Sequence, residues 1–308
     1  MITGSRGFVG GSVGSYAAAA GHEVLGIGRS SQPATDWSGS YLQADIASVD
    51  LSASINEFAP DVILHAAGTA SVGASLLAPF DDLRAAALTW ANLLEGVRRS
   101  NHRPLLLFPS SAAVYGNPAE LPVHEEMPVR PISPYGFHKA VCEMLAREYA
   151  SCFGLEVIVC RLFSIFGARQ RRLLVWELYR QLTGDERVAW LEGTGLESRD
   201  YLHIDDAAAA LFELIEGSRK ARQPPGGCLI VNVAGGEEIN VTELARQIRD
   251  RVAPGKEIRC RGAERAGDPR RWRADVSRLR ELAPRWQPVS FSTRLAQCLA
   301  AWQKESEL

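Results

Sequence analysis

A tyrosine and a lysine four residues apart, Tyr135 and Lys139, carry the clearest chemistry in the sequence. If a helix begins near Pro134, this spacing places both side chains on one helix face. A lysine ammonium beside a phenol favours the phenolate, and so lowers a tyrosine pKa from its ordinary value of about 10. Such a tyrosine can take a proton from an alcohol or give one to a ketone oxygen. Ser111 ends an apolar run, so we expect it at the carboxyl end of a buried strand, bonded to the same oxygen.

A glycine turn near the start of the sequence indicates what these residues would act with. Its pattern is G-x-x-G-x-x-G, followed by a helix-like run to Ala20 and an apolar segment from Glu23 to Ile27. Such a unit binds a dinucleotide pyrophosphate, because glycines let the backbone approach the phosphates and the helix N-terminus offers free N–H groups. Only three residues precede the turn, where about five or six are usual, so either the first strand is short or residues upstream are missing from this numbering. The expected cofactor contacts here are Gly4, Arg6, Gly7, Phe8, Val9 and Gly10.

The end of the second predicted strand indicates which dinucleotide binds. A carboxylate at this point binds the ribose 2′-hydroxyl of NAD, whereas an arginine accommodates the 2′-phosphate of NADP. The sequence has Arg29 and Ser30 here and no acidic residue, with Arg6 as a second basic side chain nearby. This favours NADP, although an arginine can also face solvent or stack on the adenine of NAD.

Two further strand ends are expected to line the cofactor. Asp45 and Ile46 end a short strand and would lie near the adenine. The apolar run that begins at Asp61 ends in small residues, where the cofactor would cross the sheet. The absence of alternation in this run indicates a parallel sheet covered on both faces. We expect His65 to be a packed strand residue, and the cofactor contacts to be Ala66, Ala67 and Gly68.

Composition excludes several classes of protein. The 308 residues are 46% hydrophobic and 23% charged, with a formal net charge of −2, so nothing draws the whole chain to nucleic acid or membrane. No apolar run is long enough to span a bilayer, and the first residues lack a secretory pattern. Six scattered cysteines suit reduced thiols in the cytoplasm, and six dispersed histidines show no metal-ligand spacing. We therefore expect a cytoplasmic protein without a metal.

The order of elements predicts an α/β fold, a Rossmann-type doubly wound parallel sheet with a smaller mixed α/β substrate lobe. Residues 1–165 would form the NAD(P)-binding domain, and about 200–217 would return to it. Residues 166–308 would form mainly the substrate-binding lobe. Within the first domain, Pro79 to Arg99 has the pattern of one long amphipathic helix, which could pack on the sheet and on a partner subunit.

These motifs together resemble the extended short-chain dehydrogenase/reductase family, the NAD-dependent epimerase/dehydratase group that acts on nucleotide-sugars. The resemblance covers nearly the whole chain and implies a triad of Ser111, Tyr135 and Lys139, with Lys139 also holding the nicotinamide ribose. It implies a homodimer formed through the Pro79–Arg99 and Tyr135–Tyr149 helices. The matching segments are residues 3–10, 65–68, 110–116, 133–139, 161–167, 199–206 and 267–269.

The two residues after Ser111 separate the reactions of this family. Members that eliminate water carry an Asp-Glu pair there, and the 3,5-epimerase/4-reductase group carries a cysteine at the second position. This sequence has Ala112 and Ala113, which can neither give nor take a proton. Elimination, and epimerisation next to the ketone by that route, are therefore not expected. Hydride transfer at one carbon remains.

A nucleotide-diphospho-sugar is the expected substrate. The guanidinium fork of Arg199 can bind two diphosphate oxygens at once, and the resemblance assigns it that role. The alternative is a surface arginine paired with Asp200. By resemblance, Arg265 and Asp268 would also contact the nucleotide, and Ser164 replaces an asparagine that often touches the diphosphate.

Three functions follow from these residues. The first is a nucleotide-sugar epimerase that moves a hydride at C4, and the second is an NADPH-dependent nucleotide-4-keto-sugar reductase. The third is a non-catalytic NADP(H)-sensing protein, against which the complete triad argues. Nucleic-acid binding by the arginine-rich segment from Lys256 to Arg285 is disfavoured, since few aromatic residues accompany the arginines.

Overall fold

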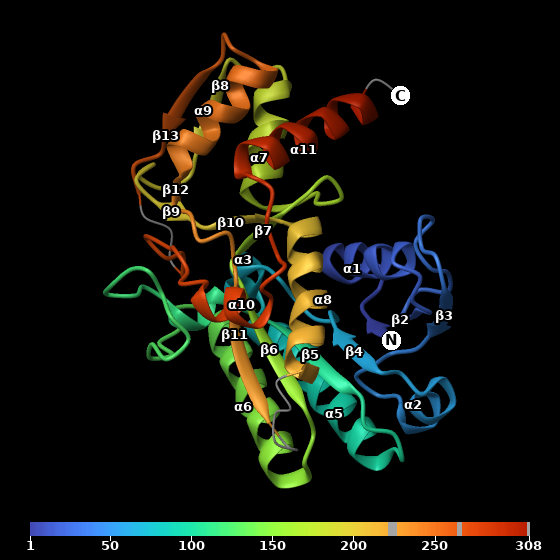
Figure 1. Ribbon diagram of the computed structural model, residues 1–308. Helices are drawn as coiled ribbons and strands as arrows, with labels where there is room; N and C mark the ends of the chain where they lie inside the picture. Colours follow the sequence, from blue (N-terminus) through green and yellow to red (C-terminus); the bar gives the residue numbers. More distant parts are fainter. Residues whose placement is uncertain (221–226, 264–266, 307–308) are drawn as a thin grey trace.

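A seven-stranded sheet forms the centre of the protein (Figure 1). The computed structural model describes residues 1–220, 227–263 and 267–306. The strand order is β11-β6-β5-β4-β1-β2-β3, and every neighbouring pair is parallel. The predicted doubly wound α/β fold is confirmed. The strands are β1 (Ile2–Thr3), β2 (Leu25–Gly28), β3 (Ser40–Gln43), β4 (Val62–His65), β5 (Leu105–Ser111), β6 (Val157–Leu162) and β11 (Cys228–Val233).

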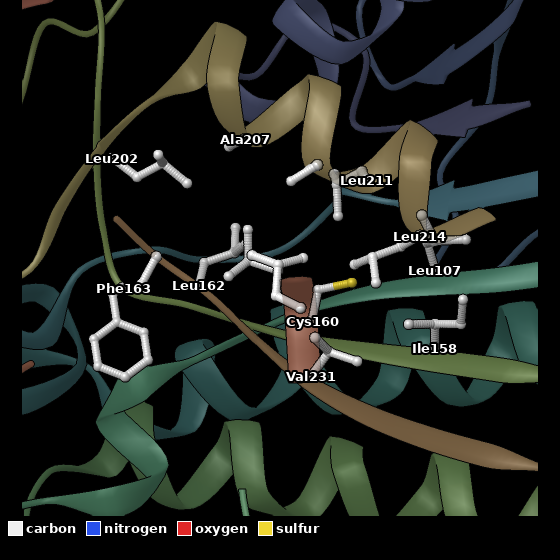
Figure 2. Packing of buried hydrophobic residues seen from close by; sticks show 14 of the residues in the cluster. Leu107, Ile158, Cys160, Leu162, Phe163, Leu202, Ala207, Leu211, Leu214 and Val231 are labelled. Atoms are coloured by element: carbon white, nitrogen blue, oxygen red, sulfur yellow. The ribbon is translucent and has the colours of Figure 1, made fainter. Parts of the chain in front are cut away.

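Helices cover both faces of this sheet, which explains why its strands are apolar without alternation (Figure 1). One face carries α1 (Phe8–Ala19), α8 (Ile204–Lys220) and α10 (Ser277–Leu282), and the other carries α2 (Ser52–Phe58), α5 (Thr89–Arg99) and α6 (Pro134–Phe153). Along β5, Leu105 and Leu107 enter the first core while Leu106 and Phe108 enter the second. Figure 2 shows the first core, where side chains of α8 lie over those of β5, β6 and β11.

A third hydrophobic core surrounds the buried Trp302, and its elements lie beyond one end of the sheet (Figure 1). It is formed by α7 (Leu173–Thr183), β8 (Val188–Leu191), α9 (Val241–Val252), β13 (Glu257–Cys260) and α11 (Phe291–Ser306). Two short ladders lie between it and the sheet: β7 (Ser164–Phe166) with β10 (Tyr201–His203), and β9 (Ser198–Arg199) with β12 (Ile239–Asn240).

Local sequence sets both ends of α6, the helix of Tyr135 and Lys139. The Ser133 hydroxyl accepts the Gly136 N–H at 3.2 Å, and Pro134 occupies the first helical position with its φ already fixed. Gly154 ends the helix in the left-handed conformation, at φ 71°.

The segment from Pro79 to Arg99 corrects the expectation of one regular helix. It consists of α4 (Pro79–Leu83), a π-helical turn (Arg84–Leu88) and α5, and is preceded by α3 (Val72–Leu77). The Thr89 hydroxyl donates to the Ala85 carbonyl at 2.6 Å, a side-chain bond that competes with regular helical pairing. Such π turns occur frequently at functional sites.

A buried ion pair fixes α6 to the sheet. Glu143 of α6 accepts from Arg161 of β6 through both oxygens, at 2.7 and 2.9 Å. The Ser110 hydroxyl donates to the same carboxylate at 2.6 Å, and Arg161 also donates to the Tyr115 hydroxyl at 2.8 Å. Removing one partner of such a pair typically costs about 3–5 kcal/mol, so this network strongly constrains where α6 lies.

The six cysteines are free thiols, as their scattered positions predict. Among the described residues, no helix combines the length and the apolar character that crossing a bilayer requires.

Candidate active site

Tyr135 and Lys139 lie in the first turns of α6 and share a face, as their spacing predicts. The Lys139 Nζ is 5.8 Å from the centre of the Tyr135 ring and 4.9 Å from that of Phe108. Lys139 is only 8% exposed, and its ammonium donates to the Pro109 carbonyl at 2.8 Å. On the other side, the Tyr135 N–H donates to the buried Ser75 hydroxyl of α3 at 3.1 Å. This turn is therefore held by both β5 and α3.

The carbonyl of Pro109 can serve Lys139 because β4 stops pairing with β5 at Leu107. Alternate residues of a central parallel strand direct their backbone groups to opposite neighbours, and here Leu105 bonds toward β4 while Leu106 bonds toward β6. Pro109 lies an even number of residues after Leu105, so its backbone carbonyl points in the same direction, toward β4. The ladder with β4 has already ended at this point. A proline has no N–H to donate, but at this position no neighbouring strand would receive one. Its carbonyl is free to accept a hydrogen bond from the Lys139 ammonium.

The two serines that end β5 point to opposite sides of the sheet. Ser110 faces α6, where it joins the buried ion-pair network. By alternation, Ser111 lies on the same side of the sheet as Leu107, and Tyr135 packs against the hydrophobic cluster that includes Leu107 and the residues directly after Ser111. The Ser111 hydroxyl accepts the Ala113 N–H at 3.2 Å. Ser110 is thereby committed to the ion-pair network, whereas Ser111 stands at the start of the turn that packs against the Tyr135 end of α6.

The residues after Ser111 pack directly against the Tyr135 turn. A Cβ added to Gly136 would lie 2.6 Å from the Ala113 carbonyl oxygen, so this approach requires glycine. Ala112 and Ala113 are both buried. They bring no proton-exchanging group to the end of β5, in line with a reaction limited to one carbon.

The glycine turn between β1 and α1 fits a dinucleotide pyrophosphate. Gly4 has φ +69°, and a Cβ there would lie 2.6 Å from the Ala66 carbonyl oxygen, while one on Gly10 would lie 2.5 Å from that of Gly4. Among the described residues no side chain caps α1 at Gly7, and its first turn contains no acidic residue. Its N–H groups are thus available to an anion, at the point where the strand order reverses between β1 and β4.

The Arg6 side chain contacts the loop that follows β2. Its Nη1 donates to the carbonyls of Gln32 at 2.7 Å and Pro33 at 2.8 Å, which fixes the loop after β2 to the glycine turn. Arg29 and Ser30 are exposed at the end of β2.

The next two strand ends lie along the same edge. Asp45 is exposed and accepts the Ala47 N–H at 3.1 Å, whereas Ile46 is buried. After β4, the Ala66 N–H donates to the Thr3 carbonyl at 3.1 Å and so continues the ladder to the glycine turn. The other two predicted contacts in this loop are Ala67, which is half-buried, and Gly68, which is exposed.

His65 is a packed residue, as expected. It is 2% exposed, its Nδ1 lies 2.9 Å from the Thr3 hydroxyl, and its ring lies against Trp90 and Phe108. Burial, and then the charge of Lys139, lower the pKa of His65 to about 3. The imidazole is therefore neutral at neutral pH.

On the substrate side, the structure brings together two of the predicted residues. Arg199 is largely buried, with its Nη2 3.3 Å from the Asp268 carboxylate and its guanidinium 5.4 Å from the centre of the Trp272 ring. Arg265 lies outside the described residues. The Ser164 side chain is half-buried, and its backbone N–H donates to the Asp200 carbonyl at 2.9 Å.

The alternative in which Arg199 pairs with Asp200 is wrong. Asp200 is fully buried and accepts backbone N–H groups of Gly235 at 2.8 Å, of Gly236 at 3.0 Å and of Ala274 at 3.0 Å. Asp200 thereby holds three chain segments together, and the ion pair of Arg199 is with Asp268 instead.

The sequence analysis missed a buried carboxylate beside the Tyr135 turn. The Asp82 carboxylate, in α4, lies 2.5 Å from the Nδ1 of His138, a histidine between Tyr135 and Lys139 in the sequence. Asp82 also accepts from the Thr69 hydroxyl. The only sequence signal was a histidine inside the motif, and it gave no indication of its partner.

The fold and the glycine turn are those of a dinucleotide-binding α/β protein, and a tyrosine–lysine pair lies at the same edge of its sheet. The model of the NAD dependent epimerase/dehydratase family matches residues 1–234. The chain belongs to this family.

Similar proteins share its length and its fold. UDP-glucose 4-epimerase of Mycolicibacterium smegmatis is 29% identical over 319 residues, which cover 100% of this chain and 99% of the relative. GDP-6-deoxy-D-mannose reductase of Pseudomonas aeruginosa is 28% identical over 255 residues, 79% of this chain and 81% of the relative. A solved structure described as MoeE5 in complex with UDP-glucose and NAD superposes with a TM-score of 0.86 at 23% identity, over 99% of this chain and 98% of that chain.

We expect Gly10→Ala to abolish dinucleotide binding, because the new Cβ would meet the Gly4 carbonyl at 2.5 Å and displace the turn. Gly73→Ala is the matched control, since a Cβ at this position in α3 meets nothing within 4 Å. Calorimetric titration with NAD and NADP measures both variants beside the unchanged protein. Full binding by the Gly10 variant, with its fold intact by circular dichroism, would contradict the placement of the pyrophosphate.

Proposed function

We propose that this protein is an NAD(P)-dependent nucleotide-diphospho-sugar epimerase that acts at C4 of the sugar. The observation that carries the proposal is the position of Tyr135 and Lys139, on one face of α6 and against the end of β5 that bears Ser111. The names of relatives such as UDP-glucose 4-epimerase and UDP-glucuronate 4-epimerase support the same reaction.

The residues divide the chemistry among them. Tyr135 takes the proton of the C4 hydroxyl and later returns it, while Ser111 hydrogen-bonds the same oxygen. The Lys139 ammonium stabilises the phenolate by Coulomb attraction. When bound, the dinucleotide serves as acceptor and then donor of the C4 hydride. Return of the hydride to the opposite face of the sugar makes the net reaction an isomerisation.

The nucleotide-sugar would lie between the sheet and the third core. Residues 1–165, joined by about 200–217, would form the cofactor domain, and residues 166–308 mainly the substrate lobe, except that β11 and α10 belong to the sheet and its cover. Arg199 is suited to the diphosphate, because its fork can bind two oxygens at once. Asp268 and Arg265 would contact the nucleotide, and Ser164 can offer one hydrogen bond to the diphosphate.

A 4-keto-sugar reductase is the second candidate. It is supported by the similarity to GDP-6-deoxy-D-mannose reductase and by Arg29, since a reductase consumes NADPH. The same tyrosine and serine would then protonate and polarise a ketone oxygen. The two candidates differ in whether the cofactor is consumed.

Tyr135→Phe is expected to lower kcat roughly 10²- to 10⁴-fold, because it removes the proton-exchanging group. Tyr149→Phe is the control, since Tyr149 lies farther along α6 and bonds Glu95 at 3.3 Å. Purified protein is incubated with UDP-, GDP- and dTDP-sugars, with and without NADPH, and the products are separated by chromatography.

Product formed without cofactor turnover identifies the epimerase, whereas stoichiometric loss of NADPH identifies the reductase. Cellular function that survives Tyr135→Phe would favour the non-catalytic sensor over both.

We infer further that NADP binds more tightly than NAD, since exposed Arg29 stands at the end of β2 where a carboxylate would select NAD. Arg29→Ala should lose about tenfold in NADP affinity, the loss of a charge-assisted hydrogen bond, with little effect on NAD. Arg251→Ala, in α9, is the control, and dissociation constants are measured for both dinucleotides. Equal affinities in the unchanged protein would remove this inference.

A homodimer is also proposed, because one side of the molecule exposes a row of apolar side chains. Phe137, Val141 and Met144 follow each other at helical spacing on α6 and are 56%, 39% and 65% exposed. On the adjoining α3 and α4, Leu77 is 90% and Phe80 is 69% exposed. A second copy would cover both rows in a two-fold arrangement.

Leu77→Asp combined with Met144→Asp is expected to give a monomer, because each charge would be buried at the proposed interface. Light scattering coupled to size-exclusion chromatography measures the mass. Val289→Asp, at an exposed apolar position before α11, is the control and should leave the mass unchanged. A monomeric mass for the unchanged protein would rule out the dimer.

A further inference from the structure

The helical strip from Asp82 to Trp90 runs along the loop that follows β4. The Thr89 hydroxyl lies 3.4 Å from the Nε2 of His65, and a Cβ on Gly68 would lie 3.4 Å from the Ala85 carbonyl oxygen. At the far end of the strip, the Thr69 hydroxyl donates to Asp82. The strip thus borders the whole segment in which the cofactor would cross the sheet.

The same strip contacts α6 on its other side. Asp82 meets the Nδ1 of His138 at 2.5 Å, and the Trp90 indole donates to the Cys142 carbonyl at 3.0 Å. His138 is the residue before Lys139 and the third after Tyr135. Asp82 is therefore the point at which the loop after β4 and the catalytic turn of α6 are joined through one side chain.

The chemistry of this junction is specific. Asp82 is 3% exposed, and the His138 side chain is 14% exposed, so the carboxylate needs partners inside the protein. An ionised carboxylate only accepts hydrogen bonds, so Thr69 and the His138 Nδ1 must both donate to it. The Asp82 Oδ1 accepts from the Thr69 hydroxyl, and the Oδ2 accepts from the His138 Nδ1.

We propose that Asp82 is a positioning residue that sets the distance between the cofactor loop (residues 66–69) and the Tyr135–Lys139 turn through Thr69 and His138. This inference rests on the proposed function, since that reaction needs the nicotinamide and the phenol aligned on one sugar carbon. A misplacement of about 1 Å can cost roughly 10²-fold in rate, so a junction at this point bears on catalysis without touching the substrate.

Asp82→Leu tests the junction, because leucine fills a similar volume without accepting a hydrogen bond. Thr69→Val removes only the link to the loop. Asp82→Asn is the conservative variant: its oxygen can still accept from Thr69, and its amide can donate to His138 once the imidazole takes the other tautomer. Trp90→Phe is the matched control, since it removes the other bond from the strip to α6 while Thr69 and His138 keep their bonds to Asp82.

Three measurements are made on the full chain. They are amide hydrogen exchange of residues 66–70, the dissociation constant for NAD, and the single-turnover rate of nicotinamide reduction by a nucleotide-sugar. Thermal unfolding is followed in parallel. Asp82→Leu and Thr69→Val should speed exchange in residues 66–70 at least tenfold and slow hydride transfer 10- to 100-fold. Asp82→Asn should stay within threefold of the unchanged protein in both.

Unchanged exchange and hydride transfer in Asp82→Leu would overturn the proposal. So would equal effects in Trp90→Phe, because these would reflect a general loss of stability. If the unchanged protein reduces no dinucleotide with any nucleotide-sugar, the proposed function fails instead. Hydrogen exchange and NAD affinity then still decide whether Asp82 holds the cofactor loop.

Discussion

The active site depends on one buried ammonium, that of Lys139, and on the carbonyl that receives it. Taking a charge out of water is costly unless acceptors replace the water, and Lys139 is only 8% exposed. The Pro109 carbonyl at 2.8 Å meets this need because the ladder of β4 ends two residues earlier. The unequal length of two neighbouring strands thus creates an acceptor at the sheet edge, and a cation can be held there next to Tyr135.

The same edge collects the other functional groups, because all strands of a parallel sheet end on one side. The glycine turn follows β1, the loop of residues 66–69 follows β4, and Ser111 ends β5. β1 lies between β4 and β2. The strands that follow β1 in the chain, β2 and β3, lie on one side of it, and β4, β5 and β6 lie on the other, so the strand order reverses at β1. A ligand at such a reversal contacts several loops at once, which is why one dinucleotide can lie between the phosphate-binding turn and the tyrosine.

Sequence predicts the parts of this site that are written in short motifs. The G-x-x-G-x-x-G turn, the Tyr–Lys spacing and the apolar run to Ser111 each depend on local geometry, and each is found in its expected element. The partner of a side chain is not local. Asp82 and His138 are 56 residues apart, and Arg199 meets Asp268 rather than its neighbour Asp200. Arg6 donates to the carbonyls of Gln32 and Pro33, and no sequence pattern predicts these partners.

The helix α6 also shows why Lys139 is not paired with a carboxylate of its own helix. Glu143 is four residues farther along, a spacing at which lysine and glutamate usually pair on a helix. Here both Glu143 oxygens are taken by Arg161, and one also accepts from Ser110. In the described part of the chain, no carboxylate forms an ion pair with Lys139. The buried arginine therefore does more than fix the helix: by pairing with Glu143, it removes the carboxylate that could otherwise pair with Lys139 one turn away.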